Sequence, residues 1–386
     1  MFDWLRRRHE TQRRLSVYPT ANGLSLALTD RDESGALVIR WVEHLGLDPL
    51  GLDAGLTLDI DDLPPDTGPD RRAEQRGGQD RRGPDRRGND RRSADRRQGD
   101  RRQQKALALS ASRADAAPPN PKMVELLQRI VRERDLRNVP CTGLLRSGDY
   151  SLVLLDSLAL PASEIRGAVR WQLRELIDFP AEESVIDVFD VPEPDGHTAR
   201  RMYAVAARRE RVQQLVNLLN LADLEIRAID IPELALRNIA ALLPEDEGGV
   251  ALISLDRQQG LMTVTRQESL YFARRVDCGT ERLLTAASGE ELTPALESLL
   301  DGLIIEVQRS LDFYERNFNQ APVTAIVFAP VPGVTRQLCD YMQAQLGVPV
   351  RWLDVAAECD VDVPDSLLLE GISVLGAALR EEQVTL

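Results

Sequence analysis

The sequence has few of the residues that metal sites and disulfide frameworks require. Its three histidines, His9, His44 and His197, are widely scattered, and its four cysteines stand alone without paired spacing. This pattern argues against a zinc or iron site and favours a reducing compartment with ordinary core thiols. The four cysteines are Cys141, Cys278, Cys339 and Cys359.

Long apolar runs are also missing. No stretch reaches the roughly 18 residues that span a bilayer, and the N-terminal MFDWLRRRHETQRR lacks the apolar segment of a secretory signal. Aromatic residues make up only 4% of the 386 residues, and apolar residues make up 43%. These values predict a soluble α/β protein of two or three domains.

Charge is distributed unevenly along the chain. Residues 70–105 contain 14 Lys/Arg and 7 Asp/Glu, whereas the rest of the chain contains 34 and 55. An Asp-Arg-Arg triplet recurs every five residues from Asp80 to Asp100, with no large apolar residue between the triplets. The composition predicts a disordered Arg-rich insertion at 45–105.

Two functions remain open for this insertion besides a solvated spacer. Its arginines are suited to the phosphates of anionic lipid or nucleic acid. However, each triplet carries its own aspartate, no aromatic side chain is present to stack on bases, and the body is acidic. Nucleic acid is therefore the less favoured partner. The apolar and basic start, Met1–Leu5 followed by Arg6, is predicted either to sit on an anionic membrane surface or to be a frayed tail.

The hydrophobic pattern predicts two halves with the same plan. Each half opens with a three-strand meander and continues with helix–strand units, including a long helix at Leu292–Phe318 in the second half. Glu245–Gly249 is predicted to be a hinge between them. The predicted meander strands are Leu15–Tyr18, Leu24–Thr29 and Ala36–Val42, then Val250–Asp256, Leu261–Arg266 and Leu270–Val276.

The stretch from Leu160 to Asp187 is predicted to be a helix on a small sheet. A strand-like run, Ser157–Leu160, precedes it, and Ser163 is suited to cap the helix start. Phe179-Pro180 is predicted to end the helix, because a residue before proline avoids the helical region. The apolar face of this helix is predicted to comprise Ile165, Ala168, Val169, Leu173, Leu176 and Ile177.

Several segments together resemble the PilM family, cytoplasmic proteins of type IV pilus assembly, and are nearest to MshI of mannose-sensitive haemagglutinin pilus biogenesis. The resemblance covers residues 123–380 well and residues 1–42 loosely. The segments that carry it are LALP, EIRGAVRWQLRELIDFP, AVAARRERVQQLVNLLNLADLEIRAIDIPELALRNI, EVQRSLDFYERN and GISVLGAALR.

The resemblance implies an actin-like ATPase fold, in which two duplicated RNase H-like domains carry a small inserted subdomain. The implied division places the first domain at 1–44, 106–152 and 209–247, the inserted subdomain at 153–208, and the second domain at 248–386. It also implies a scaffold or ring beneath the inner membrane. That scaffold would bind the cytoplasmic tail of a bitopic membrane protein, PilN or MshJ in the relatives, in a groove beside the inserted subdomain.

The nucleotide positions implied by this fold depart from the expected pattern. The first phosphate hairpin would need Asp, Gly and Lys, but Ser16–Gly23 has no Asp or Lys, and Pro19 removes an amide donor. In the second hairpin Asp256 is present, but Arg257-Gln258 replaces an apolar residue and a glycine. We therefore expect a non-catalytic protein that has lost or weakened binding of ATP and magnesium. The alternative is an active ATPase that uses Asp256.

The remaining candidate residues follow from the same comparison. Gly279 stands where the family has two glycines, and Gly333 is the single glycine near the adenosine turn, which reads Ala329-Pro330 here. For partner binding, Trp171 is predicted to face solvent beside Arg170 and Arg174, with Phe179 nearby. A solvent-facing tryptophan is a candidate hot spot, although it is equally suited to pack on a neighbouring subdomain.

Overall fold

The computed structural model describes residues 13–31, 37–47, 118–192, 200–287, 293–331, 334, 337–359 and 365–380. Three predictions lie outside these residues: the membrane-binding start at Met1–Leu5, the Arg-rich insertion with its Asp-Arg-Arg triplets, and the role of Gly333. Among the described helices, none combines the length and apolar character required to cross a bilayer.

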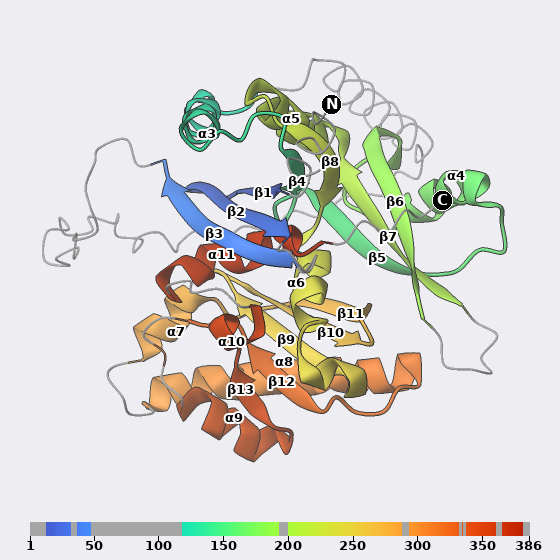
Figure 1. Ribbon diagram of the computed structural model, residues 1–386. Coiled ribbons are helices and arrows are strands. Elements are labelled where there is room, and N and C mark those ends of the chain that lie inside the picture. Colours follow the sequence, from blue (N-terminus) through green and yellow to red (C-terminus); the bar gives the residue numbers. More distant parts are fainter. Residues whose placement is uncertain are drawn as a thin grey trace, which may run out of the picture. The chain divides into compact units, whose positions relative to one another are not determined.

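Two five-stranded sheets share one strand order, which confirms the predicted duplication (Figure 1). In each sheet three antiparallel strands form a meander, and two parallel strands extend it from the first strand of the meander. The first sheet has the order β3-β2-β1-β4-β8, built from β1 (Arg14–Pro19), β2 (Gly23–Arg31), β3 (Leu37–Gly46), β4 (Pro140–Leu144) and β8 (Glu225–Asp230). The second has the order β11-β10-β9-β12-β13, built from β9 (Val250–Leu255), β10 (Gly260–Arg266), β11 (Ser269–Val276), β12 (Ala325–Phe328) and β13 (Val350–Trp352).

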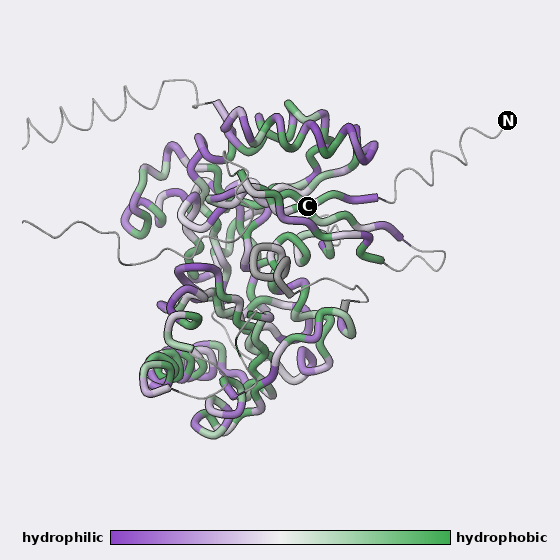
Figure 2. The backbone as a smooth tube through the Cα atoms, turned by 90° about the vertical axis from the view of Figure 1, so that its left-hand side faces the viewer, coloured by the Kyte–Doolittle hydropathy of each residue, from purple (hydrophilic) through white to green (hydrophobic). Residues whose placement is uncertain are grey.

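Helices bury the apolar faces of both sheets. In the first domain, Leu127 of α3 (Pro121–Glu133) and Leu219 of α5 (Arg209–Leu221) share a buried cluster with Val17 of β1. In the second domain, Tyr314 of the 25-residue α8 (Pro294–Phe318) is fully buried in the cluster that contains Ile253 of β9. Figure 2 shows hydrophobic colour along the central strands and alternating colour along the helices. The other helices of this domain are α7 (Thr280–Ala286), α9 (Gln337–Leu346) and α10 (Val355–Cys359).

Two helices lie between the sheets and join the domains. α11 (Asp365–Ala378) contacts β1, β2 and β3, whereas α6 (Pro232–Ala240) contacts β9, β10 and β11, and the two helices contact each other. Their crossing is close at Gly376, where an added Cβ would lie 2.1 Å from the carbonyl oxygen of Ala235. Asn238 donates a hydrogen bond of 2.9 Å to the carbonyl oxygen of Gly376. A glycine is therefore required for this contact between the helices.

A small subdomain is inserted into the first domain. Its antiparallel sheet has the order β5-β7-β6, and it begins at Tyr150, three residues before the predicted boundary. Helix α4 packs on one face of this sheet through Val169 and Leu173, which are fully buried. The elements are β5 (Tyr150–Asp156), α4 (Ala162–Leu173), the 3₁₀ helix η2 (Ala181–Glu183), β6 (Ser184–Val191) and β7 (Arg201–Arg208).

Three local predictions in this subdomain are wrong. Ser163 does not cap α4, because the N-cap position is Pro161, which has no side-chain acceptor. The helix ends at Leu173, because the regular four-residue bonding stops there. Arg174 donates to Trp171 and Leu176 to Leu173, three residues back, although Ile177 still donates to Leu173. The run Ser157–Leu160 forms no strand, because its last sheet-like bond is from Ser157 to Arg200.

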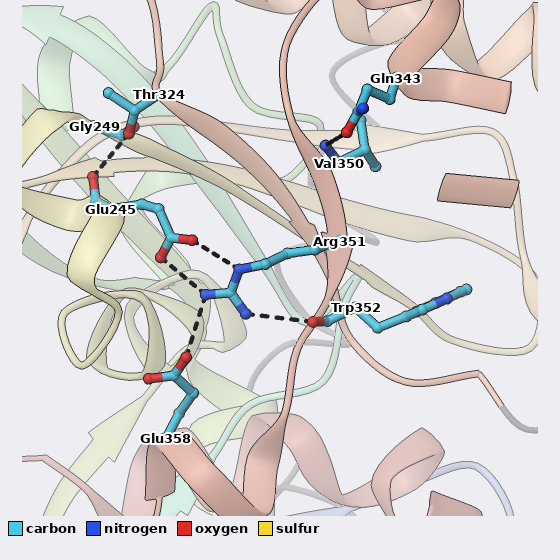
Figure 3. Close-up of polar contacts among 8 residues, drawn as sticks. All are labelled: Glu245, Gly249, Thr324, Gln343, Val350, Arg351, Trp352 and Glu358. Carbon is cyan, nitrogen blue, oxygen red and sulfur yellow. Dashed lines mark hydrogen bonds and ion pairs between the residues drawn. The ribbon is translucent and has the colours of Figure 1, made fainter. Parts of the chain in front are cut away.

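The predicted hinge at Glu245–Gly249 is instead held at both ends (Figure 3). It forms the 3₁₀ helix η3 (Pro244–Gly248), and the Glu245 carboxylate accepts hydrogen bonds of 2.7 and 2.9 Å from Arg351. Arg351 also donates to Glu358 at 3.3 Å. At the other end, Thr324 donates a hydrogen bond of 3.0 Å to the carbonyl oxygen of Gly249. The segment that connects the two domains is therefore a turn held by hydrogen bonds.

The Glu245–Arg351 pair is expected to make stability depend on acid pH. Hydrogen bonds from Arg351 lower the pKa of Glu245, although partial burial opposes this. Because the folded pKa lies below the ordinary value of about 4.3, the stabilisation is present above that value and is lost as pH falls through the folded pKa. Replacing Arg351 with Met should reduce the free energy of unfolding by about 1 kcal/mol at pH 7 and flatten its fall as the pH drops below the ordinary pKa of the carboxylate.

Urea unfolding at several pH values measures this effect. Arg309→Met is the matched control, because Arg309 is an exposed residue of α8. If the free energy of unfolding fell equally steeply with decreasing pH in both variants, the Glu245–Arg351 pair would not be the source of this pH dependence.

Candidate functional site

A cavity of about 690 Å³ lies between the two domains, where the turns of their first hairpins face each other. The β1–β2 turn contributes Thr20, Ala21 and Asn22, and the β9–β10 turn contributes residues 256–259. Both turns follow the first strand of a duplicated sheet, so the duplication itself brings them to equivalent positions. Other lining residues are Tyr18, Arg146, Ser147, Pro232, Ser254, Gly260, Leu261, Arg275, Glu281, Ile372 and Ser373.

Asp256 lies in this cavity but is held in the turn. Its Oδ1 accepts hydrogen bonds from the backbone amides of Gln258 at 2.9 Å and Gln259 at 2.8 Å. This is the local bonding by which aspartate stabilises tight turns. Only Oδ2 is left for a ligand, which weakens Asp256 as an anchor for a hydrated cation. Within the described residues, no group of three or more His, Cys, Asp or Glu could hold a metal ion.

Gly279 allows the β9–β10 turn to approach the start of α7 closely. A Cβ at this position would lie 2.3 Å from the backbone carbon of Gln258. The first backbone amides of α7 donate hydrogen bonds to the turn. Thr280 donates to the backbone carbonyl oxygen of Asp256 at 2.8 Å, and Glu281 donates to that of Arg257 at 3.0 Å. These amides are therefore already occupied and are not available to a phosphate group.

Positive charge in the cavity is only partly balanced. Arg257 pairs with Glu281 at 2.8 Å. Arg146 is 3.5 Å from Asp149, a carboxylate that also pairs with Arg211 at 3.3 Å. The guanidinium of Arg275 makes no hydrogen bond or ion pair with any described residue.

A buried acid pair lies close to Arg275. Tyr150 of β5 donates a hydrogen bond to Glu233 of α6, and both side chains are buried. Burial raises the pKa of Glu233, whereas the Tyr150 hydrogen bond and the charge of Arg275 oppose that rise. Burial and the carboxylate together raise the pKa of Tyr150 well above its usual range. Strands and helices of both domains and of the subdomain therefore meet beside the cavity.

Sequence reasoning missed Arg146, Ser147, Arg275 and Ser373 as cavity residues. They come from three separate parts of the chain, and no local pattern links these parts. The only signal was the charged dipeptide Arg274-Arg275 in an otherwise apolar strand.

The residues predicted to bind a partner differ in exposure: some lie on the surface, and one lies in the core. Trp171 is 69% exposed. The guanidinium carbon of Arg174 lies 3.9 Å from the centre of the Trp171 ring, while Arg174 also pairs with Glu182 at 2.6 Å. Arg170 is half-buried on the same helix, and its Nε has no hydrogen-bond partner in the described part of the chain.

Phe179 is wrong as a surface contact. It is buried in the subdomain core with Val169 and Leu173, and Arg208 lies over its ring at 4.3 Å. Leu176, predicted to belong to the apolar face of the helix, lies beyond the end of α4 and is 57% exposed. The exposed large hydrophobic residues of this subdomain are Leu160, Trp171, Leu176 and Val185.

Comparison with known proteins gives one family match. The family model described as Type IV pilus assembly protein PilM matches residues 122–288, less than half of the chain. Comparison with curated protein sequences gives no significant match.

Among solved structures, a PilM–PilN type IV pilus biogenesis complex matches with a TM-score of 0.58 and 16% identity, over 95% of this chain and 96% of that chain. A Bacteroides thetaiotaomicron protein with an actin-like ATPase fold and unknown function matches with a TM-score of 0.42 and 9% identity, over 96% and 99%. The cytoplasmic domain of EpsL, an inner-membrane component of the Vibrio cholerae type II secretion system, has a TM-score of 0.42 and 10% identity, over 96% of each chain. The protein thus has the actin-like ATPase fold, and its residues 122–288 match the PilM family of type IV pilus assembly proteins.

Proposed function

We propose that this protein is a cytoplasmic scaffold of a type IV pilus assembly machine, peripheral to the inner membrane. The observation that carries the proposal is the position of the family match, because residues 122–288 contain the whole inserted subdomain. The partner in this proposal is a bitopic inner-membrane protein like PilN. The finer assignment, an MshI-like scaffold with an MshJ-like partner and assembly into a ring, is part of the same proposal.

The inserted subdomain offers two features for an extended tail. Four large apolar side chains are exposed on it, whereas only five others are exposed in the rest of the described chain. Trp171 combines a large apolar surface with a fixed position under Arg174, which is typical of residues that dominate binding energy. The sheet order also leaves the outer edges of β5 and β6 without a neighbouring strand among the described strands, as strand addition requires.

Replacing Trp171 with Ala tests this surface. We expect affinity for a synthetic peptide of the partner's cytoplasmic tail to fall at least tenfold, because truncation removes the largest exposed apolar side chain of the subdomain. Fluorescence anisotropy measures the affinity, and thermal unfolding checks that the fold is intact. Leu221→Ala is the matched control, because Leu221 is 51% exposed on α5, outside the subdomain. Equal affinities for both variants would contradict the proposed surface.

The proposed scaffold does not depend on ATP hydrolysis. The turn bonds of Asp256 and the occupied amides at Gly279 support the loss of a magnesium–nucleotide site. A second candidate, an ATP-binding protein of the same fold, is favoured by the cavity between the two hairpin turns. Micromolar binding of ATP that requires magnesium would favour this second candidate.

A further inference from the structure

Two arginines from different domains line one cavity and have incomplete charge partners. Arg146 follows β4 in the first domain, and Arg275 belongs to β11 in the second. We propose that this cavity binds a phosphate-type anion directly through Arg146 and Arg275, without a magnesium ion. The inference rests on the proposed loss of the magnesium–nucleotide site, and it is independent of partner binding at Trp171.

The charges of the cavity favour an anion. Arg257 and Glu281 neutralise each other at 2.8 Å, which leaves Arg146 and Arg275 against the single carboxylate of Asp256 among the lining residues. Arg146 shares the single carboxylate of Asp149 with Arg211, and Arg275 has no ion-pair partner among the described residues. Guanidinium groups in this state bind phosphate oxygens with two parallel hydrogen bonds.

One carboxylate that interacts electrostatically with Arg275 is buried and does not line the cavity. Glu233 is only 5% exposed and already accepts a hydrogen bond from Tyr150. It can attract Arg275 over a distance without forming an ion pair with it. The guanidinium therefore keeps its donors for a ligand.

Neutral donors complete the site. Thr20 is only 7% exposed, and its Oγ1 has no hydrogen-bond partner in the described part of the chain. Asn22, Ser147 and Ser373 add further polar side chains to the same cavity. A buried hydroxyl without a partner is costly, so a ligand oxygen at this position would stabilise the folded protein.

Cation-dependent binding is disfavoured by the same geometry. The Oδ1 of Asp256 is bonded to two backbone amides, and Glu281 is paired with Arg257. The arginines would therefore supply the charge that magnesium supplies in nucleotide sites. Magnesium in solution should compete with the protein for the anion and weaken its binding.

Calorimetric titration of the full chain with pyrophosphate, tripolyphosphate and ATP tests the inference. With EDTA present, we expect at least one of these anions to bind, and added magnesium to lower its affinity. Binding of pyrophosphate or tripolyphosphate would show that a nucleoside is not needed, whereas binding of ATP alone in EDTA would identify a nucleotide phosphate chain as the source.

Arg275→Gln should lower the affinity at least tenfold. Arg274→Gln is the matched control, because adjacent strand residues point to opposite faces and Arg274 does not line the cavity. The arginine repeats of 70–105 are present in both variants, so any anion binding by them contributes equally to both titrations. Thermal unfolding of both variants confirms that they fold equally well.

Three results would overturn the inference: equal affinities for Arg275→Gln and Arg274→Gln, no binding of any anion, or binding only when magnesium is present. The last result would also overturn the proposed loss of the magnesium–nucleotide site. Loss of peptide binding in Trp171→Ala, in contrast, concerns only the scaffold surface.

Discussion

Replacement of Gly376 with Val is expected to destabilise the protein by about 3 kcal/mol. A Cβ at this position would lie 2.1 Å from the carbonyl oxygen of Ala235 and 2.6 Å from its carbonyl carbon. These are backbone atoms of α6, so no side-chain rotation can relieve the overlap. The helices would have to separate at the crossing that holds both sheets. Urea unfolding monitored by circular dichroism measures the change.

Gly302→Ala is the control for the effect of replacing a glycine within a helix. Gly302 lies in the interior of α8, and a Cβ there would meet nothing within 4 Å. Alanine should therefore stabilise the protein by roughly 0.5–1 kcal/mol, because glycine has low helix propensity. If Gly376→Val proved as stable as the wild-type protein, the close crossing of α6 and α11 would be disproved.

The second large effect is expected when Arg380 is replaced with Met. Arg380 donates a hydrogen bond of 2.6 Å to Asp230, whose side chain is only 1% exposed. Without Arg380, the aspartate at the end of β8 would remain buried without its cation, which typically costs about 3 kcal/mol. The methionine retains most of the apolar stem, so the loss reports on the charge. Denaturant unfolding at pH 7 gives the difference.

Arg316→Met gives the comparison for a surface pair. Arg316 and Asp312 are 3.9 Å apart on α8, and their side chains are 81% and 66% exposed. Loss of this pair should change stability by less than about 0.5 kcal/mol. Adding Asp230→Asn to Arg380→Met should recover part of the lost stability, because it removes the unpaired charge. No recovery would show that Arg380 acts through packing.

The inserted subdomain and the cavity are expected to have separate functions. Trp171 lies on the solvent side of α4, whereas the cavity is lined by the hairpin turns, β11 and α11. The two proposals therefore make independent predictions, and either can fail without the other. Partner binding is tested by a substitution on the surface, and anion binding by a substitution in the cavity.

The sequence by itself determined the duplicated plan. Strand alternation and helical periodicity are local properties, so both meanders, the helix at Leu292–Phe318 and the exposure of Trp171 could be predicted from neighbouring residues alone. The sequence placed Asp256 at the end of a predicted strand, and the structure shows that its carboxylate accepts hydrogen bonds from the amides of Gln258 and Gln259 in the turn that follows.

Only the tertiary structure decided what these elements bring together. Phe179 stands before the proline predicted to end the helix, yet it is buried, because it packs with Ile186 and Met202 of the subdomain sheet. The segment Glu245–Gly249 is polar and contains two glycines, but Arg351, more than a hundred residues away, holds it in place. Arg146 and Arg275 line one cavity for the same reason: the placement of distant segments depends on how whole domains pack, and no local spacing records it.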